Sequence, residues 1–118
     1  MARLSTHVLD TANGVPAAGV RVTLHRFNDA DQAELIADRI TNAEGRTDSP
    51  LLSGESVPCG RYRLTFHAGD YFRGRGTRLP EPPFVDVVDL RFGIADPAGH
   101  YHVPLLVSPW SYSTYRGS

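Results

Sequence analysis

The sequence has little of what several classes of protein require. Its 118 residues include one cysteine, Cys59, so the chain can form neither an internal disulfide nor a thiolate metal cluster. Nowhere do about 18 apolar residues follow one another, as a transmembrane helix requires. The first ten residues also lack the apolar run of a secretory signal peptide. We therefore expect a soluble protein that is not exported and does not act at a membrane.

Net charge is nearly absent as well. Twelve basic and thirteen acidic residues give a formal charge of -1, and no basic run follows the spacing of a phosphate backbone. Nucleic acid is therefore not an expected partner. Apolar residues make up 41% and charged residues 21%, which is an ordinary globular balance. No internal repeat or biased segment occurs, so we predict one domain over residues 1–118.

Short runs of alternating apolar and polar residues are the regular feature of the chain. Such runs, separated by segments rich in Gly, Pro, Asn and Asp, are typical of strands and turns. We predict an all-β fold, a two-sheet β-sandwich of seven to eight antiparallel strands. One short helix is expected at 68–76, before the prolines of 80–83. The inward positions of the clearest runs are Val20, Val22 and Leu24; Tyr62, Leu64 and Phe66; and, more weakly, Leu35, Ala37 and Ile40.

The C-terminal part of the chain carries two signs of contact with another subunit. Pro104 interrupts the strand predicted over 100–109, and proline is tolerated in a strand only at an edge or a bulge. The apolar run 105–107 makes both faces of that strand hydrophobic, which is more than one core uses. The last residues, SPWSYSTYRGS, are aromatic where most chains end in a polar tail. We infer a homo-oligomer with an ordered C-terminus that belongs to a site.

Five histidines invite a chemical interpretation. His100 and His102 share one face of their predicted strand and could chelate a metal, but a zinc site needs a third ligand and no sequence motif supplies one. We therefore expect no metal and no cofactor. His25 and His67 are interpreted as structural residues. His7 interrupts an apolar stretch, and the residues alone leave a structural and a catalytic role open.

Arg46 lies in the predicted turn NAEGRTD, where a solvated charge is the simplest interpretation. No nucleophile elbow, phosphate-binding loop or dinucleotide fingerprint is present. From the residues alone, the interpretation stops at an oligomeric sandwich with candidate histidines.

Four segments resemble the transthyretin-related proteins, and among them the 5-hydroxyisourate hydrolases. The terminal signatures are LSTHVLDTANGVPAAGVRVTLHR at 4–26 and HYHVPLLVSPWSYSTYRGS at 100–118. The middle agrees through TNAEGRTDSPLL at 41–52 and CGRYRLTFHAGDYF at 59–72. The closing YRGS is typical of the hydrolases, whereas the hormone carrier transthyretin ends differently and has a lysine at the place of His7.

The resemblance implies a transthyretin-like homotetramer with its active site between dimers. The implied reaction is hydrolysis of 5-hydroxyisourate to 2-oxo-4-hydroxy-4-carboxy-5-ureidoimidazoline in urate catabolism, a part of purine degradation. In the implied mechanism one histidine takes a proton from water and an arginine stabilises the charge on the carbonyl oxygen, and which histidine acts is open. The implied catalytic residues are His7, Arg46, His102 and Ser118, and the implied substrate-binding residues are Ser113, Tyr115, Arg116 and Gly117.

Two other functions remain open at this point. The first is a transthyretin-like carrier that binds a small molecule without turning it over. The second is a structural sandwich domain that has no small-molecule site. The resemblance also bears on the compartment, because eukaryotic members of the family tend to carry a peroxisomal signal. The terminal RGS is a poor match to S-K-L, so we expect a cytoplasmic protein.

Overall fold

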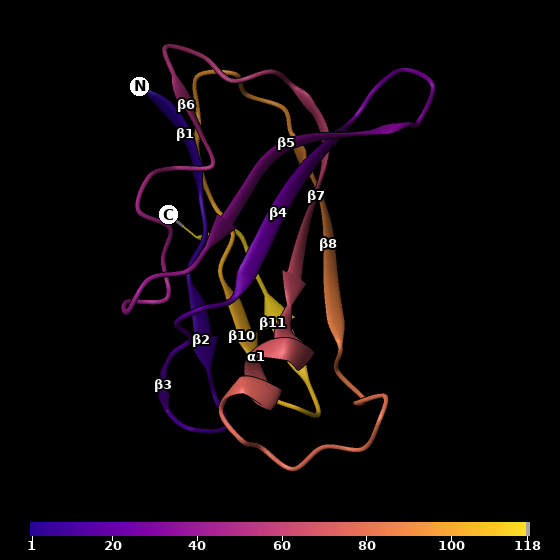
Figure 1. The fold of residues 1–118 in the computed structure, drawn as a ribbon. Coiled ribbons are helices and arrows are strands. Elements are labelled where there is room, and N and C mark those ends of the chain that lie inside the picture. The colour runs from indigo at the N-terminus through magenta and orange to yellow at the C-terminus, as the bar shows by residue number, and fades with distance from the viewer. Residues whose placement is uncertain (118) are drawn as a thin grey trace.

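The computed structural model describes residues 1–117, and its strands form two layers (Figure 1). The first layer is an antiparallel sheet in the order β5 (Ala33–Ile40), β4 (Arg21–Phe27), β7 (Gly60–His67) and β8 (Val87–Ile94). The second layer contains two sheets. One has the order β6 (Leu52–Gly54), β1 (Ala2–Ser5) and β9 (His100–His102), and the other β11 (Tyr112–Thr114), β10 (Leu105–Val107), β2 (Val8–Asp10) and β3 (Val15–Pro16). The predicted β-sandwich with one short helix, α1 (Ala68–Gly74), is confirmed.

The two sheets of the second layer are joined where β1 passes into β2 and β9 into β10. The N–H of Val103 donates to the carbonyl of Ser5 over 2.9 Å, and the N–H of Leu105 donates to the carbonyl of His7 over 2.9 Å. The ladder therefore continues across both breaks. Pro104 lies in the second break and has no N–H to donate, which explains why the single strand predicted over 100–109 is divided.

Two details of the predicted sandwich were wrong. The pairs β1–β9 and β2–β10 are parallel, and the described residues form eleven short strands rather than seven to eight. Alternation of apolar and polar residues determines which face of a strand is buried, but it is the same for parallel and antiparallel neighbours. The direction of pairing therefore could not be predicted from the pattern.

The core between the layers confirms the inward faces predicted for β4 and β7. Burial of a large apolar side chain stabilises a fold by about 1.5–3 kcal/mol, so these strands contribute much of the folding energy. Six predicted core residues are at most 1% exposed: Val20 immediately before β4, Val22 and Leu24 on β4, and Tyr62, Leu64 and Phe66 on β7. The second layer contributes the fully buried Leu4, Val8 and Leu105.

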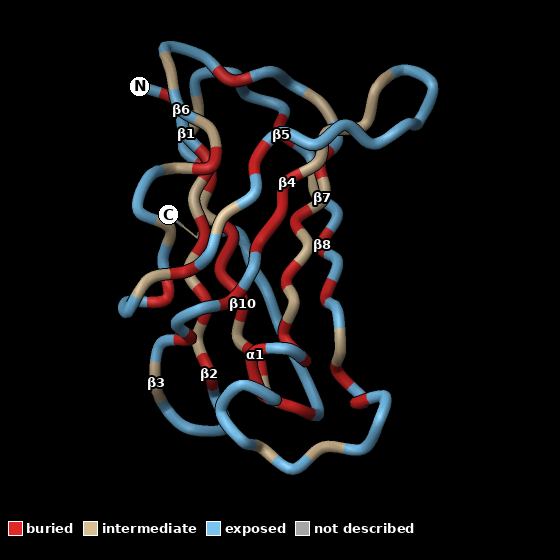
Figure 2. Tube along the Cα trace, viewed as in Figure 1, coloured by how far each residue is buried: buried red, intermediate tan, exposed pale blue. Residues whose placement is uncertain are grey.

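The predicted burial of Leu35 and Ile40 on β5 was wrong, because each is 59% exposed and only the alanine between them, Ala37, is buried. Leu35 pairs with His25 and Ile40 pairs with Arg21, and both partners lie on the outward face of β4. A register shift in the β4–β5 pair brings Leu35 to that face. Figure 2 shows the resulting exposure along this edge strand and its hairpin loop.

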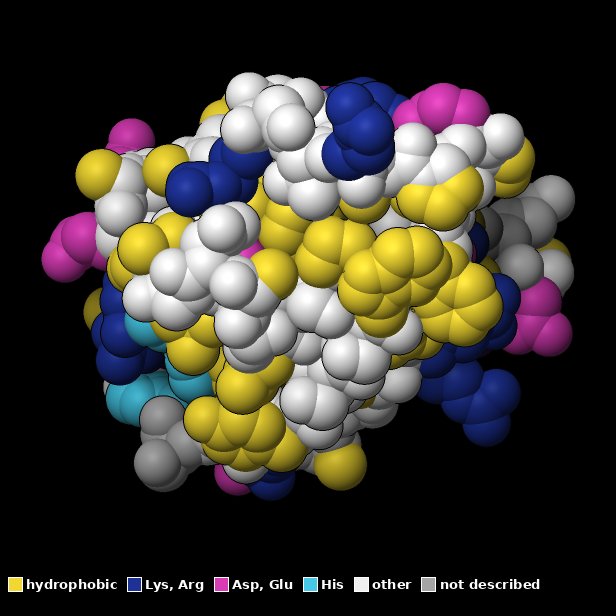
Figure 3. Space-filling view, turned by 90° about the horizontal axis from the view of Figure 1, so that it is seen from below, with side chains coloured by type: hydrophobic (Ala, Val, Ile, Leu, Met, Phe, Trp, Pro, Cys, Tyr) yellow, Lys and Arg dark blue, Asp and Glu magenta, His cyan; other side chains and the backbone are white. Residues whose placement is uncertain are grey.

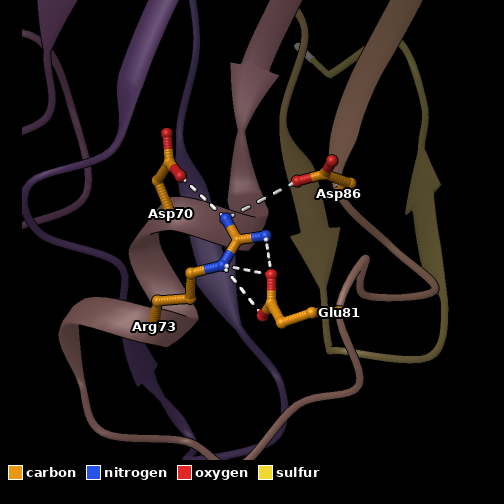
Figure 4. Close-up of polar contacts among 4 residues, drawn as sticks. All are labelled: Asp70, Arg73, Glu81 and Asp86. Carbon is orange, nitrogen blue, oxygen red and sulfur yellow. Dashed lines mark hydrogen bonds and ion pairs between the residues drawn. The ribbon is translucent and has the colours of Figure 1, made fainter.

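Helix α1 is attached to the loop that follows it through Arg73 (Figure 4). The guanidinium lies 2.8 Å from Asp70, 2.9 Å from Glu81 and 3.8 Å from Asp86. Gly76, with φ of 78°, ends the helix before the prolines are reached. Among residues 1–117, no helix is long and apolar enough to cross a membrane.

Asp10 is a buried carboxylate on β2 that links the second layer to α1. It accepts a 2.7 Å hydrogen bond from the Tyr71 hydroxyl and bonds of 3.0 Å and 2.7 Å from the backbone and side chain of Asn13. Burial alone would raise the pKa of Asp10, but these hydrogen bonds outweigh it and the net pKa is lowered. The ionised form is therefore the one that stabilises the fold.

Replacement of this carboxylate should destabilise the protein most at neutral pH. We expect Asp10→Asn to reduce the free energy of unfolding at pH 7 by about 1–3 kcal/mol, because the charged acceptor of buried donors is lost. The contribution of Asp10 is present above its unfolded pKa of about 3.9 and is lost as pH falls through the lower folded value. Urea unfolding at several pH values should show the difference shrinking toward acid. The exposed Asp29→Asn is the control, and a pH-independent difference would contradict the assignment.

Candidate active site

His7 and Arg46 are brought side by side by a tight turn. They form an antiparallel β-bridge, and the N–H of Val8 donates to the carbonyl of Gly45 over 2.8 Å. The turn is closed by the N–H of Asn42, which donates to the carbonyl of Arg46 over 2.7 Å. A Cβ on Gly45 would lie 2.4 Å from the Val8 carbonyl oxygen, so only glycine allows this approach. The turn therefore fixes Arg46 against the break between β1 and β2.

His102 is enclosed from two sides. It is the register partner of Ser5 in the parallel β1–β9 pair, and the Ser5 hydroxyl lies 2.9 Å from its Nδ1. On the other side, the N–H of Gly117 donates to the His102 carbonyl over 2.7 Å. A Cβ on Gly117 would lie 2.7 Å from the His102 Cδ2, so the imidazole packs directly against this glycine. The end of the chain is thus held against His102 as far as the structure describes it.

A small polar cavity opens beside His102. Its volume is about 230 Å³, and two guanidinium groups and two imidazoles surround it. No carboxylate lines it among residues 1–117, so the cavity is suited to a ligand that carries or develops negative charge. The lining residues are Arg3, Ser5, Arg46, His100, Tyr101 and His102.

The pKa of His102 is lowered below its usual value of about 6.5. Burial is the largest cause, and the positive charges of Arg46, His7 and Arg3 add to it. His102 is therefore neutral at neutral pH and can accept a proton there. The same electrostatic effects mean that Arg46, His7 and Arg3 each lie near His102.

His7 is held through a different ring atom. Its Nε2 lies 2.8 Å from the carbonyl oxygen of Glu44. A carbonyl oxygen only accepts hydrogen bonds, so Nε2 carries the hydrogen and, in neutral His7, Nδ1 carries the lone pair. His7 and His102 are therefore held through different ring nitrogens, His7 through Nε2 and His102 through Nδ1.

The other predicted site residues are divided between the two faces of the C-terminal segment. Ser113 and Tyr115 are exposed and alternate with Gly117. The Arg116 guanidinium lies 4.1 Å from the centre of the Tyr101 ring and donates a 3.3 Å hydrogen bond to the His100 carbonyl, and it borders a groove together with Tyr115. Ser118 lies outside the described residues. The structure thus brings His7, Arg46, His102 and Gly117 together, and it directs the Arg116 side chain to the Tyr101 ring and the His100 carbonyl.

The two histidines considered as a metal pair both line the cavity, but His100 contacts the carbonyl of Met1 through its Nε2. Within residues 1–117 no group of three or more His, Cys, Asp or Glu side chains is placed to hold a metal ion.

Arg3 and Ser5 are site residues that the sequence interpretation missed. Both alternate with His7 in the sequence, so on an extended strand they would share its face, and that signal was present in the sequence. Their contact with the cavity depends on the parallel partner of β1, and no local pattern identifies that partner.

A family model described as "HIUase/Transthyretin family" matches residues 4–117. The chain is 58% identical over 118 residues to the 5-hydroxyisourate hydrolase of Pseudomonas aeruginosa, covering 100% of this chain and 93% of that protein. It is 57% identical over 116 residues to 5-hydroxyisourate hydrolase 2 of Rhizobium meliloti, covering 98% of this chain and 96% of that protein.

Solved structures agree with these relatives. A crystal structure of (S)-allantoin synthase has a TM-score of 0.92 and 50% identity, covering 99% of this chain, which spans 44% of that protein. The 5-hydroxyisourate hydrolase of Klebsiella pneumoniae has a TM-score of 0.82 and 37% identity, with 100% of both chains covered. Sea bream transthyretin in complex with thyroxine has a TM-score of 0.85 and 31% identity, covering 98% of this chain and 94% of that one.

The electrostatic coupling in the cavity can be measured directly. Arg46→Gln removes a positive charge near His102, so the pKa of His102 should rise toward its usual value. An NMR titration of the histidine resonances measures this change. Arg61→Gln, on the exposed face of β7, is the matched control and should leave the value in place. An unchanged pKa in Arg46→Gln would mean that the two groups are farther apart than described.

Proposed function

Because the chain belongs to the HIUase/Transthyretin family, we propose that its cavity is the active site of a 5-hydroxyisourate hydrolase. The substrate is an oxidation product of urate, and hydrolysis opens its six-membered ring to give 2-oxo-4-hydroxy-4-carboxy-5-ureidoimidazoline. Full-length relatives at up to 58% identity carry this name. The observation that carries the site assignment is the meeting of His7, Arg46 and His102 beside one cavity that no described carboxylate lines.

His102 is the proposed proton acceptor. Its Nδ1 is occupied by Ser5, and its lowered pKa keeps the ring neutral at neutral pH. Nε2 can then take a proton from the water that attacks the ring carbonyl, which typically accelerates a reaction by about 10²–10⁴-fold. The new C–O bond forms as the ring C–N bond breaks, and the proton held by His102 passes to the departing nitrogen. The net change is the addition of one water molecule.

Arg46 is proposed to stabilise the charge that develops on the carbonyl oxygen, and His7 is proposed to orient the water or the substrate. The Arg46 guanidinium donates toward the carbonyl oxygen as negative charge develops there, a contribution on the order of 3 kcal/mol for one such donor. His7 lies across the β-bridge from Arg46, with Nε2 committed to the Glu44 carbonyl. Its Nδ1 is the nitrogen left to orient water or substrate. Side chains supply both the proton transfer and the charge stabilisation, so the proposed reaction involves no cofactor.

The C-terminal residues complete the proposed site. Gly117 already contacts His102, and Ser118 is proposed to hydrogen-bond the substrate or the water through its hydroxyl or terminal carboxylate. We propose that Ser113, Tyr115 and Arg116 bind substrate, with Tyr115 limiting the pocket to a purine-sized molecule.

A homotetramer is proposed as the working form. Edge strand β8 and the 112–116 segment border one groove of about 320 Å³ between the layers, and unpaired strand edges invite association. Hydrophobic side chains also gather on the end of the molecule seen in Figure 3. Phe84 and Trp110 are 75% and 60% exposed, with ring centres 6.3 Å apart. A single domain over 1–118 and a cytoplasmic location are also our proposals.

A carrier function is the second candidate, supported by the likeness to a transthyretin solved with thyroxine. It predicts saturable binding of an iodinated aromatic compound, measured by calorimetry, without turnover of 5-hydroxyisourate.

The hydrolase proposal is tested with substrate generated freshly from urate by urate oxidase. The purified protein should remove the near-ultraviolet absorbance of 5-hydroxyisourate much faster than buffer does. His102→Ala should lose about 10²–10⁴-fold and Arg46→Ala about 10²–10³-fold in rate. Arg61→Ala, remote from the cavity, serves as the control. Decay no faster than in buffer with the wild-type protein would reject the enzyme in favour of the carrier.

The pH dependence follows from the state of His102. Its pKa lies below about 6.5, and only the neutral ring accepts a proton. We expect kcat/KM to stay constant from neutral pH to below 6.5. It should then decline as pH falls through the lowered pKa of His102. Initial rates over a pH series, corrected for spontaneous decay of the substrate, measure this limb. A midpoint clearly above 6.5 would count against His102 as the acceptor.

A further inference from the structure

Contacts on two sides of the His102 imidazole leave one ring nitrogen free. Nδ1 lies 2.9 Å from the Ser5 hydroxyl, and the Cδ2 edge packs against Gly117. The remaining nitrogen, Nε2, has no hydrogen-bond partner among the described residues. We propose that Ser5 is a positioning residue that selects the tautomer of His102 with its hydrogen on Nδ1 and its lone pair on Nε2. The inference rests on the proposed function and deepens it.

The position of the Ser5 hydroxyl is determined by the fold. Ser5 lies directly opposite His102 in the β1–β9 ladder, and its carbonyl accepts the N–H of Val103. The neighbouring register pair, Leu4 and Tyr101, is buried in the core. Neither strand can therefore shift along the other without exposing apolar surface. Backbone and core hold the hydroxyl oxygen at the imidazole, and the hydroxyl hydrogen can rotate to leave a lone pair facing Nδ1.

The direction of the hydrogen bond follows from the chemistry required of His102. A neutral imidazole carries one hydrogen, so a lone pair on Nε2 requires the hydrogen on Nδ1. Nδ1–H then donates to the Ser5 oxygen. When Nε2 accepts a proton from water, the Nδ1–H bond persists and stabilises the imidazolium. The same contact thus supports the ring before and after proton transfer.

A hydroxyl suits this place better than a carboxylate would. Among the described residues, the titratable side chains around His102 are Arg3, His7, Arg46, His100 and Tyr101, and none of them is a carboxylate. A carboxylate at Nδ1 would raise the pKa of the imidazole and leave more of it protonated at neutral pH. Ser5 orients the ring without adding charge. The free nitrogen thereby stays available as a base.

Histidine tautomers are tested directly by ¹⁵N NMR of histidine-labelled full-length protein at a pH where His102 is neutral. The wild type should show His102 with hydrogen on Nδ1. Ser5→Ala should shift the population toward a mixture of tautomers, and Ser5→Thr, which keeps the hydroxyl, should restore the wild-type pattern. Ser53→Ala, an exposed serine of the neighbouring strand β6, is the matched control. Hydrogen on Nε2 in the wild type, or an unchanged pattern in Ser5→Ala, would overturn the proposal.

Kinetics provide the second measurement. Ser5→Ala should lower kcat by about 10-fold with little change in KM, and Ser5→Thr should recover it. Thermal unfolding identifies a variant that simply fails to fold, and in that case the tautomer of the wild type still decides the proposal. The NMR result does not depend on turnover. A wild-type protein that hydrolyses nothing would reject the proposed function while leaving the tautomer assignment to be judged on its own spectrum.

Discussion

The site depends on the parallel ladder that pairs β1 with β9 and β2 with β10. Two backbone hydrogen bonds, from Val103 to Ser5 and from Leu105 to His7, join segments that lie almost a whole chain apart in sequence. This ladder places the Ser5 hydroxyl at His102. It also brings His7, and through the adjoining turn Arg46, to the same place. The residues that line the cavity are brought together only when these two segments pair.

The rest of the sandwich makes that arrangement rigid. Leu4 and Val8 are fully buried in the core, whereas Arg3 and Ser5, which alternate with Leu4 along β1, line the cavity. Arg3, Arg46 and the imidazoles repel one another when charged, and burial of the core offsets that cost. Burial, together with this repulsion, lowers the pKa of His102 and keeps its ring neutral at neutral pH, as the proposed proton transfer requires. The stability of the core and the reactivity of the cavity are therefore linked through the same strands.

Local patterns predicted the parts of this fold that depend on one strand at a time. The buried faces of β4 and β7 follow from period-two alternation, and the short helix follows from its composition. Such patterns do not predict contacts between distant strands. The parallel pairing, the bulge that turns Leu35 outward and the Ser5–His102 contact each depend on which segments become neighbours. His7, Arg46 and His102 were named through resemblance to a family. The residues alone had left a structural and a catalytic role open for His7, had interpreted Arg46 as a solvated charge, and had considered His102 only as half of an incomplete metal pair.

The contact between His7 and the turn has a consequence for how the sequence can vary. Glu44 holds the imidazole with its main-chain carbonyl, and its carboxylate takes no part in that bond. The identity of the side chain at this position is therefore nearly neutral for the geometry of the site. The next position is the opposite case, because any side chain in place of Gly45 would collide with the Val8 carbonyl. Two adjacent residues thus differ sharply in mutational tolerance, and the strict one does not line the cavity.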